Sequence, residues 1–203
     1  LQKNNFIGVI GKSGSGKTTF IDLVSGLLSP TNGCIYFNAT NFKNINLNNI
    51  KNLIGYSSQN NFLIDDTIEK NIVLDEIINY DKIEEITKML HIDKFIDSLE
   101  YGLKTKIGEN GILVSGGQKQ RILLARAIYD NPDVLILDEA TNAIDINLEK
   151  EILFSLKEKF KDKIVIYITH RITSLEICDK VYLIKNSLLK ELPKDDNYNK
   201  YFK

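Results

Sequence analysis

The feature that most constrains the fold of this 203-residue chain is the stretch GKSGSGKT, residues 11–18, which directly follows the apolar run FIGVI. The stretch fits the spacing G-x-x-x-x-G-K-[ST], and the segment after it has apolar residues at helical spacing. Glycines in such a loop allow backbone N–H groups to converge on phosphate oxygens, and the N-terminus of the following helix adds favourable partial charge. A strand before the loop and a helix after it therefore predict a phosphate-binding loop rather than an ordinary glycine-rich turn.

Within this loop, Lys17 is expected to reach the β- and γ-phosphates of a nucleotide, and the hydroxyl of Thr18 is expected to bind Mg²⁺. The residues predicted to contact the nucleotide here are Gly11, Ser13, Gly14, Ser15, Gly16, Lys17, Thr18 and Thr19. The loop therefore predicts a site for a nucleoside polyphosphate and its magnesium ion.

A second candidate element, VLILDEA at 134–140, contains two adjacent acids. Its four consecutive apolar residues suit a strand that is covered on both faces, and ligands of open α/β sheets bind at the carboxyl ends of such strands. We expect Asp138 to hold Mg²⁺ through its water shell and Glu139 to take a proton from an attacking water. Two exposed acids at a strand end are common in isolation, but beside a phosphate-binding loop they indicate hydrolysis.

Predicted strands and helices alternate along most of the chain. Apolar runs predict strands at 6–11, 34–38, 52–59, 134–137, 163–170 and, as the last strand, 180–186. Helical spacing predicts helices from 17 to near Gly26, at 118–129 and at 147–160, and only helices from residue 67 to about 99, while 38–49 is expected to be loop. The predicted fold class is α/β, a P-loop NTPase (RecA-like) core with a mainly parallel sheet at 1–65 and 131–203. An inserted α-helical subdomain is expected at 66–130.

Composition excludes several classes of protein. Hydrophobic residues make up 43% and charged residues 26% of the chain, and the net charge is -1, so no basic surface predicts a nucleic-acid partner. No apolar run approaches the roughly 18 residues that span a bilayer.

Cys34 and Cys178 are far apart in sequence and are expected to be buried free thiols of a reducing compartment. The chain has only three arginines, Arg121, Arg126 and Arg171, which indicates that lysine could not replace arginine at these three positions.

The stretch VSGGQKQR, from residue 114, places a second glycine-containing anion site at the start of a helix. At this point the sequence resembles the nucleotide-binding domain of ABC transporters, whose signature motif is LSGGQ. The other elements of that family follow in order: Gln59 in GYSSQ matches the Q-loop, NAID at 142–145 matches the D-loop pattern SALD with Asn142 in place of serine, and His170 matches the H-loop.

The resemblance implies ATP and Mg²⁺ as ligands and ATP hydrolysis as the activity. It implies catalytic roles for Glu139, His170 and Gln59, and metal binding by Thr18, Gln59 and Asp138. The additional residues implied in nucleotide contact are Ser115, Gly116, Gly117, Gln118 and Asp145.

Two stretches resemble the exporter branch of this family: NNFLIDDTIEKNI after the Q-loop, and TKIGENG before the signature, where Asn110 replaces the usual arginine beside Glu109. Two features depart from the family. No adenine-stacking aromatic residue precedes the phosphate-binding loop, and KNSLLKEL lacks the glycine that usually makes a turn there. We therefore expect a missing upstream strand with such an aromatic residue, preceded by a transmembrane domain in the same polypeptide, at the cytoplasmic face of the membrane.

In the family, the phosphate-binding loop and the signature motif meet only across a dimer, so the resemblance implies a second nucleotide-binding domain, most simply in a homodimer. The leading interpretation is the motor domain of an ABC exporter that drives substrate export or flipping. One alternative is a soluble ABC-type ATPase acting on nucleic acid or ribosomes. A small-molecule kinase is a second alternative, although it leaves VSGGQ, Gln59 and His170 unexplained. The sequence does not identify the transported substrate.

Overall fold

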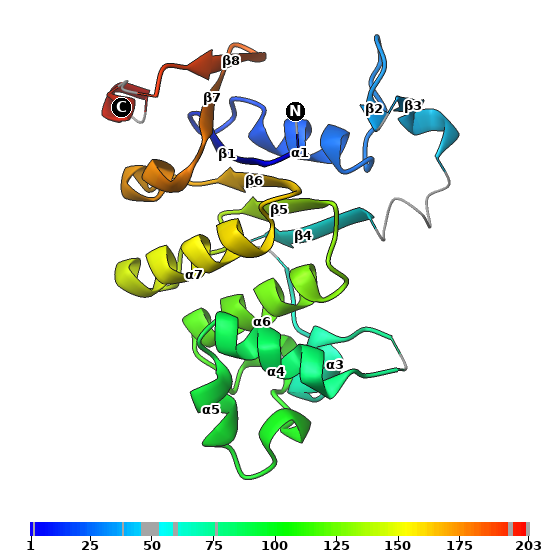
Figure 1. Ribbon diagram of the computed structural model, residues 1–203, viewed down its shortest axis with the longest axis vertical. Coiled ribbons are helices and arrows are strands. Elements are labelled where there is room, and N and C mark those ends of the chain that lie inside the picture. Colours follow the sequence, from blue (N-terminus) through cyan, green and yellow to red (C-terminus); the bar gives the residue numbers. More distant parts are fainter. Residues whose placement is uncertain are drawn as a thin grey trace.

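The computed structural model describes residues 1, 3–37, 39–45, 53–58, 61–75, 77–194 and 197–201. Among these residues, six strands form one sheet in the order β4-β5-β6-β1-β7-β8 (Figure 1). The strands are β1 (Asn5–Ile10), β4 (Ile54–Ser58), β5 (Val134–Asp138), β6 (Ile164–Ile168), β7 (Lys180–Lys185) and β8 (Leu188–Leu192). All neighbouring pairs are parallel except β7 and β8, which confirms the predicted α/β fold with a mainly parallel sheet.

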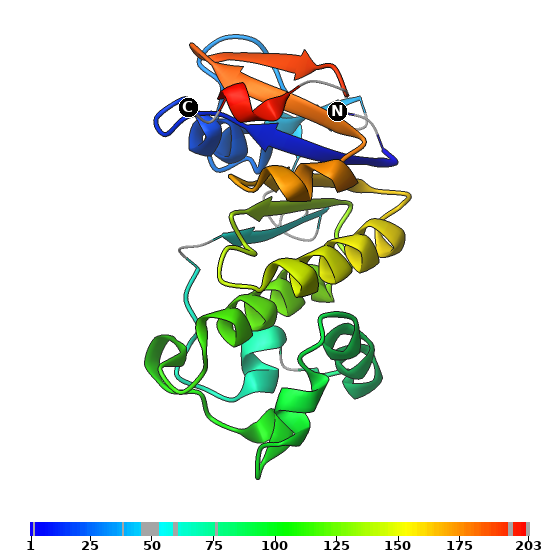
Figure 2. The same cartoon turned by 90° about the vertical axis from the view of Figure 1, so that its left-hand side faces the viewer.

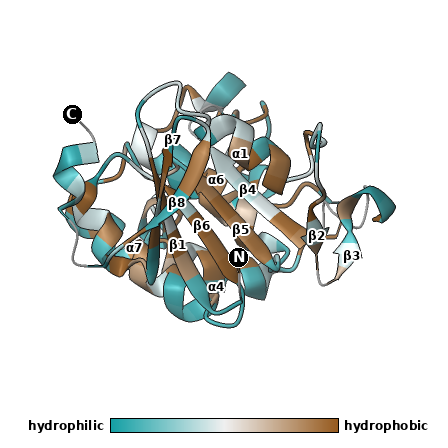
Figure 3. Ribbon diagram, turned by 90° about the horizontal axis from the view of Figure 1, so that it is seen from above, coloured by the Kyte–Doolittle hydropathy of each residue, from teal (hydrophilic) through white to brown (hydrophobic). Residues whose placement is uncertain are grey.

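Alternate residues of the central strands face two separate apolar layers. In β5, Val134 and Ile136 pack in the cluster that contains Ile21 of helix α1 (Lys17–Val24). Leu135 and Leu137 face the opposite cluster, which includes residues of α6 (Gly116–Tyr129) and α7 (Ile146–Lys159). This period of two places helices on both faces, and Figure 3 shows the most apolar residues along the central strands. A small antiparallel ribbon, β2 (Tyr36–Phe37) and β3 (Thr40–Asn41), lies beside the α1 face.

The helical part of the molecule lies below the sheet in Figures 1 and 2, with α6 and α7 between them. It contains α3 (Ile68–Ile72), α4 (Tyr80–Met89) and α5 (Asp93–Asp97), followed by 3₁₀ helices at Gly102–Lys104 and Glu109–Gly111. One buried cluster includes Ile83 of α4 together with Leu135 and Val165 of the sheet, so the apolar core is continuous through α6. The boundaries of the helical subdomain at 66–130 stay a prediction.

Sequence-based expectations differ from the structure at the last strands of the sheet and in segment 38–49. The strand at 180–186 is not the last, because β8 returns antiparallel to it. The turn between β7 and β8 needs no glycine: Asn186 (φ 51°) and Ser187 (φ 61°) both adopt the left-handed conformation that suits a tight hairpin. Segment 38–49 contains β3 and a 3₁₀ helix at Phe42–Asn44 within its described residues, because the ribbon pairing there is too short to give a periodic signal. Helix α1 ends at Val24, close to the expected end near Gly26, because Gly26 (φ 78°) adopts a left-handed conformation just beyond it.

Both cysteines are free thiols, as expected, but only Cys178 is buried, whereas Cys34 is exposed next to β2. Burial raises the pKa of the Cys178 thiol to about 12, so this thiol is protonated at neutral pH. Within the described residues, the helices are all too short or too polar to cross a membrane.

Candidate nucleotide-binding site

The loop between β1 and α1 is shaped by its glycines. A Cβ atom on Gly11 would lie 2.5 Å from Ser15 Oγ and 2.7 Å from the carbonyl oxygen of Ile184, so the loop closes tightly only with glycine there. Gly16 (φ 103°) is the N-cap of α1 and offers no side chain to the helix. The first N–H groups of α1 are therefore left without a side-chain cap and are available to an anion.

The ammonium group of Lys17 closes the same loop. Lys17 Nζ donates hydrogen bonds to the carbonyl oxygens of Gly11, at 2.7 Å, and Lys12, at 3.1 Å. The hydroxyl of Ser15 is buried and has no hydrogen-bond partner. A cationic lysine, uncapped helix N–H groups and an unpaired buried hydroxyl together suit a polyphosphate.

A cavity of about 510 Å³ opens over this loop. Its lining residues are Ser13, Gly14, Gly16, Lys17, Thr18, Thr19, Tyr56, Ser58, Asp138, Glu139 and His170. The ends of β4, β5 and β6 meet at this edge of the sheet, which is why residues far apart in sequence share the cavity. The structure thus brings together the predicted phosphate loop, both predicted acids and the predicted histidine.

Asp138 is the last residue of β5 and is partly buried. Burial raises the pKa of its carboxyl group, the neighbouring charge of Glu139 raises it further, and the ammonium of Lys17 opposes both. The hydroxyl of Tyr56 lies 3.5 Å from Asp138 Oδ2. A carboxylate disfavoured by burial and a like charge gains most from a bound cation.

Glu139 begins the loop between β5 and α7 in a left-handed conformation, φ 52°, which is uncommon for a residue with a side chain. Both of its carboxylate oxygens have donors. His170 Nε2 lies 3.0 Å from Oε1, and Asn142 Nδ2 donates to Oε2 at 2.8 Å. The carboxylate is therefore held at the wall of the cavity from two sides.

The oxygen atoms at this edge fit a magnesium ion that is shared with a nucleotide. Among the described residues, no group of three or more His, Cys, Asp or Glu side chains is placed to hold a metal by itself. The hydroxyl of Thr18 and the carboxylate of Asp138 both line the cavity, and Mg²⁺ binds through one or two protein oxygens, substrate phosphates and waters. Gln59, the third predicted metal ligand, lies outside the described residues.

The signature motif forms a separate structure. Ser115 is the N-cap of α6 in a capping box: its hydroxyl accepts from Gln118 N at 3.3 Å, and Gln118 Oε1 accepts from Ser115 N at 2.8 Å. Gly116 and Gly117 follow at the first turn, and a Cβ on Gly117 would lie 3.0 Å from the carbonyl of Ala143. Neither these residues nor Asp145, the N-cap of α7, line the described cavity.

Three residues around the cavity are not among the predicted site residues. Tyr56 and Ser58 line it from β4, and Asn142 contacts Glu139. Alternation along β4 indicates which residues share a face, but it does not indicate which strand lies beside β5. The sequence marks Asn142 only as a departure from the D-loop pattern.

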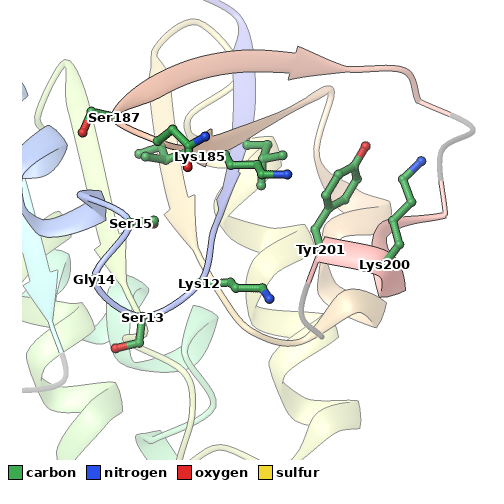
Figure 4. A pocket seen from close by; sticks show the side chains of 11 residues that line it. Lys12, Ser13, Gly14, Ser15, Lys185, Ser187, Lys200 and Tyr201 are labelled. Atoms are coloured by element: carbon green, nitrogen blue, oxygen red, sulfur yellow. The ribbon is translucent and has the colours of Figure 1, made fainter.

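A further cavity, of about 410 Å³, adjoins the outer side of the phosphate loop. Figure 4 shows that its walls come from that loop, from the β7–β8 hairpin and from the 3₁₀ helix Tyr198–Tyr201. Lys12, Lys185 and Lys200 contribute to the lining, so the surroundings of the loop are cationic on this side as well.

Comparison with known proteins shows the family of this chain. A family model described as ABC transporter matches residues 1–142, and the chain therefore belongs to the ABC transporter family. A putative export ATP-binding/permease protein of Rickettsia bellii is 41% identical over 184 residues, which are 91% of this chain and 32% of the relative. An ATP-dependent lipid A-core flippase of Pectobacterium atrosepticum is 37% identical over 187 residues, again 91% of this chain and 32% of the relative.

A solved structure, that of a bacterial Atm1-family ABC exporter with ATP bound, superposes with a TM-score of 0.91 at 28% identity. The match covers 98% of this chain and 35% of the exporter chain. The chain thus spans about a third of the length of the relatives it matches, and its fold is that of their ATP-binding part.

Proposed function

We propose that this chain is the ATP-hydrolysing motor domain of an ABC exporter, working at the cytoplasmic face of a membrane. The observation that carries the proposal is the cavity at the carboxyl edge of the sheet, where Lys17, Asp138 and the His170–Glu139 pair converge. Family membership supports ATP as the nucleotide, and the names of the relatives, an export ATP-binding/permease protein and a lipid A-core flippase, support transport.

In this proposal, the uncapped N–H groups of α1 and the ammonium of Lys17 bind the β- and γ-phosphates of ATP. Mg²⁺, held by Thr18, Asp138 and, by resemblance, Gln59, would neutralise charge on the phosphate oxygens. Glu139 accepts a proton from the attacking water, while His170 and Asn142 keep its carboxylate oriented. By the resemblance to the family, His170 also contacts the γ-phosphate.

The partners are a second copy of the domain and a membrane-spanning domain. Ser115 and its glycines lie at an exposed helix N-terminus apart from the cavity, so a homodimer would let each signature motif cap the ATP of the other copy. Association around ATP and release after hydrolysis would move the membrane domain between two states. We propose that this domain lies in the same polypeptide, as the name of the export ATP-binding/permease relative suggests for that protein.

Replacing the proposed general base tests the function. Glu139→Gln keeps the size of the side chain but replaces one carboxylate oxygen with an NH2 group and removes its basicity. Hydrolysis of Mg-ATP should fall by roughly 10²–10⁴-fold while binding of a fluorescent ATP analogue is retained. Glu100→Gln, at an exposed position in the helical part, is the matched control and should hydrolyse ATP at the normal rate. Wild-type turnover of Glu139→Gln would remove Glu139 from the mechanism.

A further inference from the structure

A buried carboxylate lies behind the site and takes no part in the proposed chemistry. Glu149 on α7 is fully buried and accepts hydrogen bonds from Tyr167 (2.8 Å), Arg171 (2.8 Å), Ser174 (3.1 Å) and Thr141. Burial raises the pKa of the Tyr167 hydroxyl, and the charge of Glu149 adds to this effect. An ionised carboxylate in such a place is tolerated only with a cationic partner and filled hydrogen-bonding positions, which here include the guanidinium of Arg171.

The guanidinium of Arg171 also holds the loop that leaves β5. Nη2 donates to the carbonyl oxygen of Asn142 at 2.7 Å, and Nη1 donates to that of Ile144 at 3.0 Å. Arg171 directly follows His170, so the contacts join the loop after β6 to the loop between β5 and α7. A lysine ammonium could not make these contacts together with the one to Glu149, because it lacks the planar fork.

The contacts of Arg171 also connect the two side chains that lie against the Glu139 carboxylate. One oxygen of its carboxylate is held by His170 and the other by Asn142. His170 directly precedes Arg171 in the chain, and the guanidinium of Arg171 donates a hydrogen bond to the main-chain carbonyl oxygen of Asn142. A change in the position of the guanidinium would therefore displace both donors of the Glu139 carboxylate.

We infer that Arg171, anchored by the buried Glu149, is a positioning residue for ATP hydrolysis that fixes the two donors of the Glu139 carboxylate. The inference rests on the proposed role of Glu139 as general base. No contact between Arg171 and ATP is part of it, because Arg171 does not line the cavity that Lys17 and the start of α1 line. Loss of the Arg171 contacts should therefore lower kcat and leave nucleotide affinity nearly unchanged.

The test compares two partly buried arginines in the full-length protein. Arg126 also binds main-chain carbonyls, those of Asn71 (2.6 Å) and Phe62 (3.0 Å), but it lies on α6 and has no contact with Glu139, His170 or Asn142 among these hydrogen bonds. Arg171→Lys should lower kcat by about 10- to 100-fold, the scale expected from misplacing a catalytic group by about 1 Å. The Kd for a fluorescent ATP analogue should change by less than about threefold. Arg126→Lys should lower the melting temperature but keep kcat within about threefold of the wild type.

Asn142 supplies a second variant in case Arg171→Lys fails to fold. Asn142→Ala removes one donor from Glu139 and should lower kcat, whereas Asn142→Ser, which restores a hydroxyl, should recover part of it. In the double variant Asn142→Ala/Arg171→Lys, the fold-loss in kcat should be smaller than the product of the fold-losses in the two single variants. The reason is that both substitutions act on the same carboxylate, that of Glu139.

Three results would overturn the inference: wild-type kcat in folded Arg171→Lys, wild-type kcat in Asn142→Ala, or a kcat loss in Arg126→Lys as large as that in Arg171→Lys. Glu139→Gln separates this failure from failure of the proposed function. If Glu139→Gln abolishes turnover and Arg171→Lys does not affect it, only the positioning role is wrong. If Glu139→Gln is fully active, the proposed general base itself is wrong.

Discussion

At the scale of single residues, each of the three arginines binds main-chain carbonyl oxygens at two positions. Arg121 donates to the carbonyls of Gly117 and His91, Arg126 to those of Asn71 and Phe62, and Arg171 to those of Asn142 and Ile144. Several N–H donors in a rigid plane can bind two carbonyls at once, which a lysine ammonium does with less precision. In a chain this poor in arginine, the residue marks points where loops are fixed to helices and strands.

Asp179 provides a further tie, between the start of β1 and α7. Its Oδ2 accepts from Phe6 N at 2.8 Å, and its Oδ1 from Lys157 Nζ at 2.6 Å. Burial raises the pKa of this carboxyl, but the hydrogen bonds from Lys157 and Phe6 and the charge of Lys157 outweigh it, so its pKa lies below the ordinary value of 3.8. A depressed carboxyl pKa stabilises the fold above the unfolded-state value, and this contribution is lost as pH falls through the folded-state value.

Asp179→Asn should therefore destabilise the protein at about pH 7, and the difference from the wild type should disappear in strongly acidic solution. Since the pair is about one-third exposed, we expect a cost of at most about 1 kcal/mol. Thermal unfolding followed by circular dichroism over a series of pH values measures it. Asp162→Asn, at an exposed position before β6, is the control. A difference that does not vary with pH would show that packing, rather than charge, is responsible.

Sequence patterns place individual residues well where the chemistry is local. Asp138 and Glu139 are expected at a strand end, and the structure has them there, at the cavity that Lys17 also lines. The contact of Asn142 with Glu139 could not be predicted, because it depends on the left-handed turn at Glu139 that folds the loop back. The roles of these residues in catalysis stay predictions.

At the scale of elements, a very close backbone approach joins β4 to α6. A Cβ on Gly55 in β4 would lie 2.1 Å from the carbonyl oxygen of Ala127 in α6 and 2.7 Å from Pro132 Cγ. Backbone atoms of a helix cannot move aside without shifting the helix. By contrast, a Cβ on Gly8 in β1 would meet only side-chain atoms, of Leu175 at 2.9 Å and Cys178 at 3.0 Å, and these can rotate.

Gly55→Ala should consequently destabilise the fold by about 1–3 kcal/mol or more, as overpacking of a tight core does. Gly8→Ala is the matched variant, also an alanine on a buried strand, and should cost roughly 1 kcal/mol or less because side chains can adjust. Urea unfolding of both variants gives the free energies directly. Equal losses in the two proteins would mean that α6 moves as readily as two side chains do.

Elements are predictable from sequence in proportion to their length and regularity. The strand β5 follows the predicted segment closely because its four consecutive apolar residues mark a buried strand, and the helices α6 and α7 do so because each is long enough to show its apolar period. The last strand, β8, escapes prediction because its first four residues, 188–191, are exposed on an edge and carry little alternation. Its turn carries Asn186 and Ser187 in place of glycine, so the usual hairpin signal is absent.

At the scale of the whole molecule, the two predicted phosphate-binding elements lie at different places on the surface of the chain. The loop 11–18 and the acids converge on one cavity, while Ser115 caps the exposed N-terminus of α6, which does not line that cavity. Inside the chain, the signature helix instead contacts the β5–α7 loop, where Gln120 Oε1 accepts from Ala143 N at 2.7 Å. This arrangement suits a molecule that completes its site with a second copy.

Mixing two inactive variants tests whether a second copy of the chain completes the ATP site. Lys17→Ala removes the ammonium from the phosphate loop, and Ser115→Arg places a bulky side chain at the signature helix, so neither homodimer has an intact composite site. In a heterodimer, one site takes its loop from the Ser115→Arg copy and its signature from the Lys17→Ala copy. Both parts of that site are unaltered, while the other site carries both changes. Because ATP would then join two protein surfaces, association in the mixture should exceed that of either variant alone, and some hydrolysis should return.

Analytical ultracentrifugation with Mg-ATP gives the comparison, with Glu139→Gln added to both variants in the association arm to prevent turnover. Each variant alone, at the total protein concentration of the mixture, controls for simple dilution. Equal association in the mixture and in both separate samples would mean that a single copy binds and uses ATP without its partner, and the signature helix would then need another role.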